Sequence, residues 1–497
     1  MNAHTPSQLA ALNTGVADAD ITTAIETLLA TKKGLNAHEI TVQTREGIVE
    51  LAGFTNSLLS RQRAGEIALA VRGVRALHSL LAVRPAGVPD AQLQHAEARA
   101  LADDPATNDY QVHCLVREGV ATLSGTVQTW AEKQLVLQVL KGVRGVRDFV
   151  ADHLLIRGEE NVKSDEEITT QIRELLDWDI RVNGALVQVR TDEQVVHLSG
   201  TVGTAAEKDR LVAIAYQTGA TRVDARDLFV AYWALGREVR REKFAPKTDE
   251  AIARAVRDTL HFNPRVRSAE TLVQVLDGVV TLAGTVSNLR TKQDAEQDAR
   301  HVVGVSNVHN LLKVRPARLV PDEDICQCIS AALARDPYVA QGDFHVQVHG
   351  GQALLSGLVS TPFELEQAGD VAAGVGGVID VNNRLEVAGP VAAHGFSTSF
   401  RSADVLRAAA PAPDHALAER IRARYCWSAS LHDQEVDVQV ENGRATLSGT
   451  VDTWLDRKHA AQAAHEAGAR EVNNHLRVLT AAPPLSRESL ANHEIAV

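Results

Sequence analysis

Apolar residues follow two different periods along this chain, and the two periods recur in a fixed order. Short segments alternate between apolar and polar residues, as in VDVQV at 436–440, and this period of two predicts a strand with one covered face. Other segments begin with acidic residues and space their apolar residues as a helix does, as in SDEEITTQIRELL at 164–176. The pattern predicts short strands that alternate with amphipathic helices.

A short motif ending in glycine marks one strand of every repeat of this pattern. ATLSGTV occurs at 121–127 and again at 445–451, and close variants occur at four other places. The motif glycines are 72 to 92 residues apart, a spacing that fits a small domain better than a solenoid repeat. These glycines are Gly53, Gly125, Gly200, Gly284, Gly357 and Gly449.

Each repeat has the order helix, strand, strand, helix, strand. A turn such as Asp277-Gly278 joins the first two strands, and a Ser, Thr or Asn four residues after the motif glycine is placed to cap the second helix. The third repeat has Asp192-Glu193 in place of a glycine turn. We therefore predict an α+β fold of six tandem αββαβ domains, each a three-stranded mixed sheet with two helices on one face. The predicted domains, called units 1 to 6, are residues 18–85, 90–157, 164–231, 248–315, 321–388 and 413–479.

The six units are predicted to be a duplicated triplet. SLLAVRPAGVPD (79–90) in unit 1 corresponds to NLLKVRPARLVPD (310–322) in unit 4. The motif glycines of units 1 and 4 lie 231 residues apart, and those of units 2 and 5 lie 232 residues apart. Residues 232–247 are predicted to connect the two halves. Residues 389–412 are rich in alanine and proline and are predicted to form a flexible linker, and residues 480–497 form a tail.

The serine beside the motif glycine raises the question of a catalytic nucleophile. Ala52 and Ala283 replace this serine in two units, and no histidine recurs at a constant distance from it. Because alanine cannot act as a nucleophile, we interpret the six glycines as structural joints, where the chain leaves a strand tightly to enter a capped helix. The histidines show no metal-ligand spacing, and the four cysteines form no CxxC pair. We expect no catalytic residue, no cofactor and no metal.

Composition narrows the range of partners. The formal net charge of −12 argues against a general nucleic-acid binder, which needs a basic surface. No segment is apolar over the roughly 18 residues that suggest a transmembrane span. The N-terminal segment lacks the basic and apolar regions of a secretory signal, which predicts a cytoplasmic location.

The repeated sequence pattern resembles the BON domain, the module named for bacterial OsmY and nodulation proteins. The resemblance is carried by LVQVLDGVVTLAGTVSNLRTKQDAEQDARHVVGVSNVHNLLKV at 272–314 and by residues 436–478, and it covers all six units. Unit 3 departs most, with Gly219-Ala220 in place of Gly-Val. The resemblance implies a protein that is not an enzyme, and periplasmic stress proteins, envelope adaptors and phospholipid-associated modules among its relatives. It therefore offers a periplasmic location as the alternative.

Two sets of polar residues are candidates for contact. A glutamine recurs on the polar face of the first strand, either as part of a solvated face or as a docking surface shared between units or subunits. The basic residues of the connector are candidates for salt bridges between the halves or for anionic lipid headgroups. The glutamines are Gln43, Gln188, Gln274, Gln347 and Gln439, and the basic residues are Arg237, Arg240, Arg241, Lys243 and Lys247.

Taken together, these features predict a binding and scaffold protein of the BON type. Its expected role is adaptation to osmotic or envelope stress through contacts with other envelope proteins or with itself as a homo-oligomer. The alternative is a peripheral phospholipid-binding envelope protein. Sheet edges favour protein contact, because an exposed edge must be paired, covered or charged.

Overall fold

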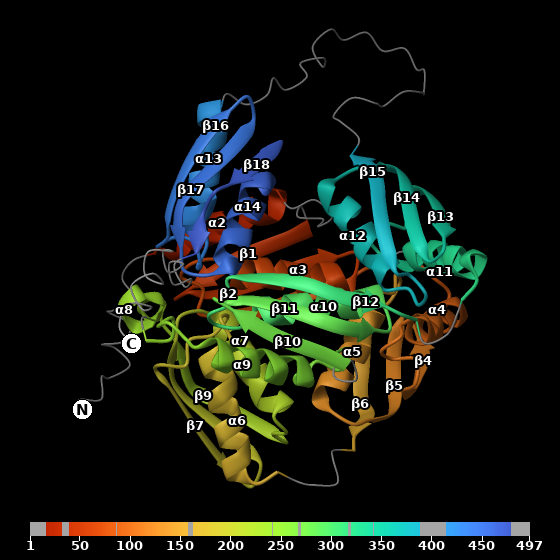
Figure 1. Cartoon of the computed structure of the whole chain (residues 1–497), viewed down its shortest axis with the longest axis horizontal. Helices are drawn as coiled ribbons and strands as arrows, with labels where there is room; N and C mark the ends of the chain where they lie inside the picture. Colours follow the sequence, from red (N-terminus) through yellow and green to blue (C-terminus); the bar gives the residue numbers. More distant parts are fainter. Residues whose placement is uncertain are drawn as a thin grey trace, which may run out of the picture.

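The structure is a computed structural model of the whole chain (Figure 1). It describes residues 16–31, 39–85, 87–157, 163–240, 242–266, 270–316, 320–340, 342–387 and 414–478. The predicted linker at 389–412 and the tail at 480–497 lie outside the described residues.

The six units predicted from the sequence are confirmed, each with the order αββαβ. In each sheet the second strand is central, antiparallel to the first strand and parallel to the third. Units 1 to 3 comprise α2 (Asp18–Thr31), β1 (Ile40–Arg45), β2 (Ile48–Thr55), α3 (Leu58–Leu69), β3 (Ala76–Val83); α4 (Asp90–Asp103), β4 (Gln111–Arg117), β5 (Val120–Val127), α5 (Trp130–Lys141), β6 (Asp148–Ile156); and α6 (Asp165–Trp178), β7 (Val187–Asp192), β8 (Val195–Val202), α7 (Ala205–Gln217), β9 (Arg222–Val230).

The second half repeats this arrangement after a short connector. The connector contains the 3-10 helix η2 (Tyr232–Leu235) and α8 (Arg237–Arg240). Units 4 to 6 comprise α9 (Asp249–Phe262), β10 (Glu270–Leu276), β11 (Val279–Val286), α10 (Leu289–Arg300), β12 (Asn307–Val314); α11 (Asp322–Arg335), β13 (Asp343–His349), β14 (Gln352–Val359), α12 (Pro362–Ala373), β15 (Asp380–Val387); and α13 (Asp414–Trp427), β16 (Glu435–Glu441), β17 (Arg444–Val451), α14 (Trp454–Glu466), β18 (Glu471–Asn474), β19 (Arg477–Val478).

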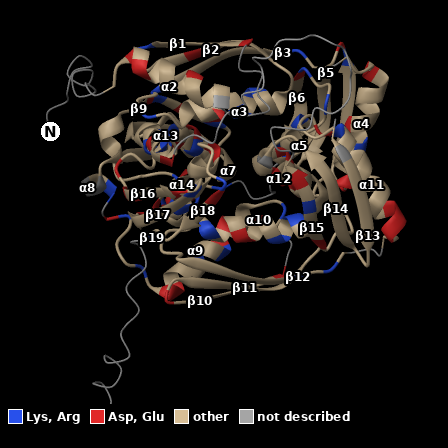
Figure 2. Cartoon of the chain, turned by 90° about the horizontal axis from the view of Figure 1, so that it is seen from above, with Lys and Arg blue, Asp and Glu red and all other residues tan. Residues whose placement is uncertain are grey.

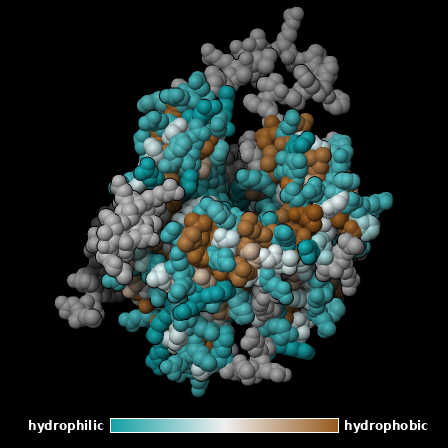
Figure 3. Space-filling model, viewed as in Figure 1, coloured by the Kyte–Doolittle hydropathy of each residue, from teal (hydrophilic) through white to brown (hydrophobic). Residues whose placement is uncertain are grey.

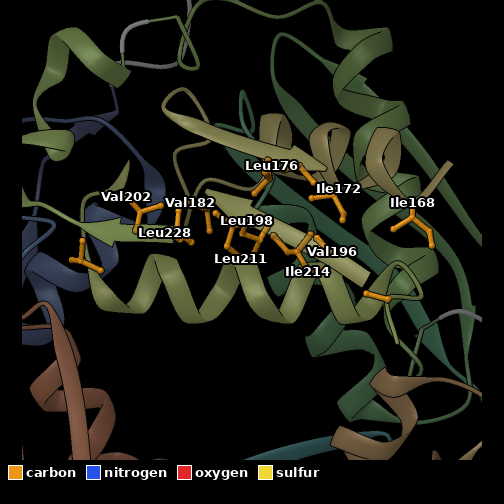
Figure 4. Packing of buried hydrophobic residues seen from close by; sticks show 14 of the residues in the cluster. Ile168, Ile172, Leu176, Val182, Val196, Leu198, Val202, Leu211, Ile214 and Leu228 are labelled. Carbon is orange, nitrogen blue, oxygen red and sulfur yellow. The ribbon is translucent and has the colours of Figure 1, made fainter. Parts of the chain in front are cut away.

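Each unit buries its own small core between its sheet and its two helices. In unit 3, Ile172 of α6, Leu198 of β8 and Leu211 of α7 are almost fully buried against one another (Figure 4). The alternating strands explain this arrangement, because every second residue points toward the helices. Six separate cores account for the spacing of the repeats in the sequence.

The helix caps predicted after the motif glycines are confirmed. Each predicted capping side chain accepts a hydrogen bond from a backbone N–H in the first turn of the second helix, as Thr204 does from Glu207 at 3.0 Å. The capping residues are Ser57, Thr129, Thr204, Asn288, Thr361 and Thr453.

The motif glycine itself lies inside the second strand and not at the exit of that strand. Its φ ranges from +112° to +137° over the six units, a region that favours glycine. A Cβ atom on Gly284 would lie 2.1 Å from the carbonyl oxygen of Glu270 on the neighbouring strand. The glycine is therefore needed because the neighbouring backbone occupies the space of a side chain.

The turn between the first two strands is held by the first aspartate of the unit. In unit 4 the Asp249 carboxylate accepts hydrogen bonds from the N–H groups of Asp277 (2.8 Å) and Gly278 (3.0 Å). The same two bonds occur in all six units and start from Asp18, Asp90, Asp165, Asp249, Asp322 and Asp414.

The turn of unit 3 differs from the sequence-based expectation. Its positive-φ residues are Glu193 and Gln194 (φ +48° and +60°), one position beyond the predicted pair Asp192-Glu193, because Asp192 pairs with Val195 in the ladder. Asp165 accepts the N–H groups of both turn residues, at 2.9 and 2.8 Å. These two bonds offset the cost of a positive φ without glycine.

The units of the two halves associate in pairs. Unit 1 meets unit 6 where Arg72 N–H donates to the Trp427 carbonyl at 2.9 Å, and unit 3 meets unit 4 where Val303 N–H donates to the Trp178 carbonyl at 2.9 Å. Unit 2 meets unit 5 where Arg144 N–H donates to the Arg335 carbonyl at 2.8 Å. A shift of three units converts the 1–6 pair into the 4–3 pair and returns the 2–5 pair to itself. The duplicated triplet is therefore folded with approximate two-fold symmetry, and the 2–5 pair lies on the axis.

Candidate functional site

A central cavity is shared by all six units. Second helices such as α3, α5, α7, α10 and α12 gather in the interior, while strands such as β1, β2, β10, β11, β13 and β14 lie outside (Figure 2). The cavity has a volume of about 1200 Å³, and residues of every unit line it. Eight arginines and nine acidic residues belong to this lining, so their formal charges nearly cancel and the cavity selects neither anions nor cations by net charge.

Two of the arginines around the cavity form ion pairs with acidic residues of another unit. Arg265 of unit 4 forms a bidentate pair with Asp104 of unit 2, with nitrogen–oxygen distances of 2.9 and 2.6 Å. Arg335 of unit 5 pairs with Asp103 of unit 2 at 3.0 Å. Such charge-assisted, partly desolvated pairs specify geometry. These two pairs therefore help to hold the units together around the cavity.

A second cluster of charges lies at the junction of units 3 and 4. Burial by itself would raise the pKa of Asp179, but Arg181 and Arg210, which contact it at 2.7 and 2.9 Å, outweigh burial and hold that pKa well below its usual range. Burial and the nearby Arg181 lower the pKa of His301 to about 3, so this ring is neutral at physiological pH. Burial raises the pKa of Asp298 to about 6. All five of these residues line a neighbouring cavity of about 540 Å³.

Aromatic side chains at the start of the second helices also join units. Trp130 of unit 2 stacks on Tyr216 of unit 3, with ring centroids 5.6 Å apart. Trp454 of unit 6 lies under the guanidinium of Arg300 in unit 4, 4.0 Å from the ring centroid. These contacts bury aromatic surface between units.

Two basic residues of the connector contact unit 3. Arg240 pairs with the buried Glu207 of unit 3 at 2.8 Å. Lys243 donates to the carbonyl oxygens of Leu176, Asp179 and Val182, and burial lowers the pKa of its amine to about 8. Both side chains point into the protein.

The other basic residues of the connector are placed differently. Lys247 is exposed, and its amine lies 5.7 Å from the ring centroid of Trp178. Arg241 and the side chain of Arg237 lie outside what the structure describes. The five basic residues thus do not form one described surface.

The five recurrent glutamines all lie exposed on the outward faces of first strands. The contacts between units described above run through helices and the segments that follow them, so the structure does not bring these glutamines together. Over the described residues, each sheet is a separate ladder with its two edge strands unpaired by other units.

The outer face of unit 4 is more apolar than its glutamine suggests. Leu272, Ala283 and Leu311 are neighbours in the ladder and form one row across the sheet. Leu272, Leu276 and Leu311 are 58%, 73% and 62% exposed, and apolar residues gather over β10–β12 on this side of the molecule (Figure 3). The sequence did not reveal this row, because β10 carries apolar residues on both of its faces and the pattern does not show which face is exposed.

Neither a metal centre nor a membrane span emerges from the geometry. Among the residues that the structure describes, no group of three or more His, Cys, Asp or Glu is placed to hold a metal ion. None of the described helices combines the length and hydropathy needed to cross a bilayer.

Comparison with known proteins defines the class. The BON domain profile matches residues 17–85, 89–158, 164–226, 248–316, 321–389 and 413–480. The chain therefore belongs to the BON domain family, as the sequence resemblance predicted.

A curated relative and two solved structures complete the comparison. Osmotically-inducible protein Y of Escherichia coli (strain K12) is 34% identical over 134 residues, which are 26% of this chain and 66% of the relative. The chain thus spans just under two thirds of that relative's length. Two structures of CdsD, a structural protein of the type III secretion system of Chlamydia trachomatis, cover 45% and 49% of this chain at 15% and 14% identity. With TM-scores of 0.12, these two structures do not indicate a shared overall fold.

Proposed function

We propose that this protein is a non-enzymatic scaffold that binds other proteins, including further copies of itself, through its outward sheet faces and edges. The observation that carries the proposal is the division of surfaces within each unit. The helix faces are used for contacts between units, whereas the sheets face outward with open edges. Open edges and exposed faces are the surfaces through which sheets recruit partners.

The outer face of unit 4 is the strongest candidate for such a contact. In its row of Leu272, Ala283 and Leu311 the two leucines are exposed, and apolar patches rimmed by polar residues are typical of protein-binding surfaces. The corresponding residues of unit 6 are Asp437, Ser448 and His475, which suit solvent. We infer that the units are specialised and that unit 4 supplies the main contact.

The biological setting follows from the relative. Similarity to an osmotically inducible protein supports a role in adaptation to osmotic or envelope stress. The cytoplasmic location predicted from the N-terminal segment gains no support from the comparisons, and the family resemblance favours the periplasm.

Light scattering behind a sizing column tests the scaffold proposal. The full chain should elute with a mass well above 53.5 kDa and should fall toward that mass in the double variant Leu272→Glu, Leu311→Glu. The matched control is Gln439→Glu on the outer face of unit 6, which should leave the mass unchanged. A monomer at high concentration, or equal loss in both variants, would contradict the proposal.

The phospholipid alternative has less support, because Arg240 and Lys243 are engaged inside the protein. It predicts that vesicles of anionic lipid retain the chain at low salt and release it at high salt. Retention that Lys247→Glu abolishes would favour the lipid function over the scaffold function.

A further inference from the structure

Unit 2 has a glutamate in its core at a position where the other five units have an aliphatic residue. Glu97 lies seven residues after the first aspartate of its unit, and its relative exposure is 0%. The corresponding residues, all with 0% exposure, are Ile25, Ile172, Val256, Ile329 and Ile421. The chain thus contains five internal controls for this position, and each favours an apolar side chain.

A second exception faces the first. Cys114 of β4 pairs with Leu123 in the ladder, and the other five units have valine at this place: Val42, Val189, Val273, Val346 and Val438. The Cys114 thiol lies beside the Glu97 carboxyl and lowers its pKa slightly, but neither carboxyl oxygen has a partner with good hydrogen-bond geometry. A buried carboxylate without a partner is costly, so this carboxyl favours its protonated form.

Among the residues that the structure describes, no counter-charge acts on the Glu97 carboxyl, and Cys114 is the one titratable group that influences it. Five charged groups on α4 and on the helices packed against it make their contacts elsewhere: Lys133 with the Ala151 and Leu154 carbonyls, Lys141 with Gln62, Glu132 with Gln128 N–H, Arg335 with Asp103, and Arg99 with Asp103. Burial is the main cause that raises the pKa of Glu97 to about 7, and burial together with Glu97 raises the pKa of Cys114 to about 12.

Helix α4 also takes part in the contacts at the centre of the assembly. It packs against α11 of unit 5, and its last residue, Asp103, pairs with Arg335. Asp104, directly after the helix, pairs with Arg265 of unit 4. Glu97 is six residues before Asp103, about 9 Å along the helix axis. A change in how α4 sits on β4 therefore reaches the 2–5 pair on the approximate two-fold axis.

We propose that unit 2 makes the contacts between units responsive to pH. With the Glu97 carboxyl protonated, α4 is closed on β4 and the contacts to units 4 and 5 are in place. With the carboxylate charged, α4 separates from β4 more readily and these contacts loosen. The inference rests on the packing of the chain and is independent of the scaffold proposal.

The direction of the effect follows from linkage. The pKa of Glu97 is raised in the folded state, from 4.5 to about 7, so the folded state holds its proton to higher pH than the unfolded state does. Stability of unit 2 therefore falls as pH rises between these two values and is constant above them. A shift of this size corresponds to opening that is more favourable by a factor of order 300.

Hydrogen exchange of the full chain tests the proposal. The ratio of protection in α4 to protection in α6, which has Ile172 at the matched position, should fall by up to roughly two orders of magnitude between pH 4.5 and pH 8. The ratio should stay constant in Glu97→Ile, which restores the residue type of the other units, and in Glu97→Gln. A constant ratio in the native protein, or an equal slope in Glu97→Ile, would overturn the proposal.

An infrared difference spectrum supplies a second test, which reports on the carboxyl group itself. The spectrum of the native protein minus that of Glu97→Gln should show the C=O stretch of a protonated, weakly hydrogen-bonded carboxyl at pH 6, and this band should disappear on titration with a midpoint near pH 7. The buried Asp298 and Asp456 are present in both proteins, so their bands cancel in the difference. Absence of such a band at pH 6, or a midpoint near that of an exposed glutamate, would also overturn the proposal.

Discussion

Substitution of the motif glycine by alanine is the most direct test of how each unit is built. In unit 4 the new Cβ of Gly284→Ala would lie 2.1 Å from the Glu270 carbonyl oxygen, at a backbone φ of +129°. An L-residue at such a φ costs about 1–3 kcal/mol, and displacing the neighbouring strand weakens at least one ladder hydrogen bond, at about 1 kcal/mol. We expect unit 4 to lose about 3 kcal/mol of stability.

The control is a glycine with positive φ and open space. Gly350→Ala in unit 5 has φ +57° and no atom within 4 Å of the new Cβ, so it should cost only about 1 kcal/mol. Because each unit has its own core, hydrogen exchange of the strands of each mutated unit measures the loss locally. If Gly284→Ala costs no more than Gly350→Ala, the close backbone approach is not the reason for the glycine.

Three further predictions concern the turn, a junction between units and a buried acid. Asp249→Asn should destabilise the first hairpin of unit 4 by about 1 kcal/mol, measured by hydrogen exchange, whereas Glu250→Gln beside it should not. A double-mutant cycle between Arg265 and Asp104 in urea unfolding should give a coupling energy of about 1–3 kcal/mol. Additive losses would show that the ion pair adds nothing to the free energy of unfolding. Burial raises the pKa of Asp456 from 3.8 to about 6, so the stability contributed at this site should fall as pH rises across that interval and then level off. Asp456→Asn should flatten the dependence seen in thermal unfolding between those pH values, and an unchanged slope would refute this assignment.

The repeated sequence pattern made the fold of each unit predictable. Alternation in segments such as 436–440 and the caps at residues such as Thr204 are local signals, and they agree across levels in every unit. The role of the first aspartate was missed, although its constant distance of 28 and 29 residues to the turn N–H groups is a signal in the sequence. The buried Glu97 was also visible in principle, as a charged residue at an aliphatic position of an aligned repeat.

The arrangement of the six units was not predictable in the same way. Contacts such as Arg265 with Asp104 join residues far apart in sequence, and nothing in the spacing of either residue names its partner. The reason is physical: hydrophobic periodicity reports which face of an element is covered, and each unit already satisfies that signal with its own core.

The sequence by itself determined six αββαβ units, the duplication of a triplet and the BON family. Only the tertiary structure decided that the second helices face one central cavity, that Arg240 and Lys243 point inward, and that the glutamines are not brought together between units. Local patterns act over a few residues and therefore specify the units. Packing between units depends on the shape and charge of assembled surfaces such as the one that joins Arg335 to Asp103, and these surfaces exist only after the units have folded.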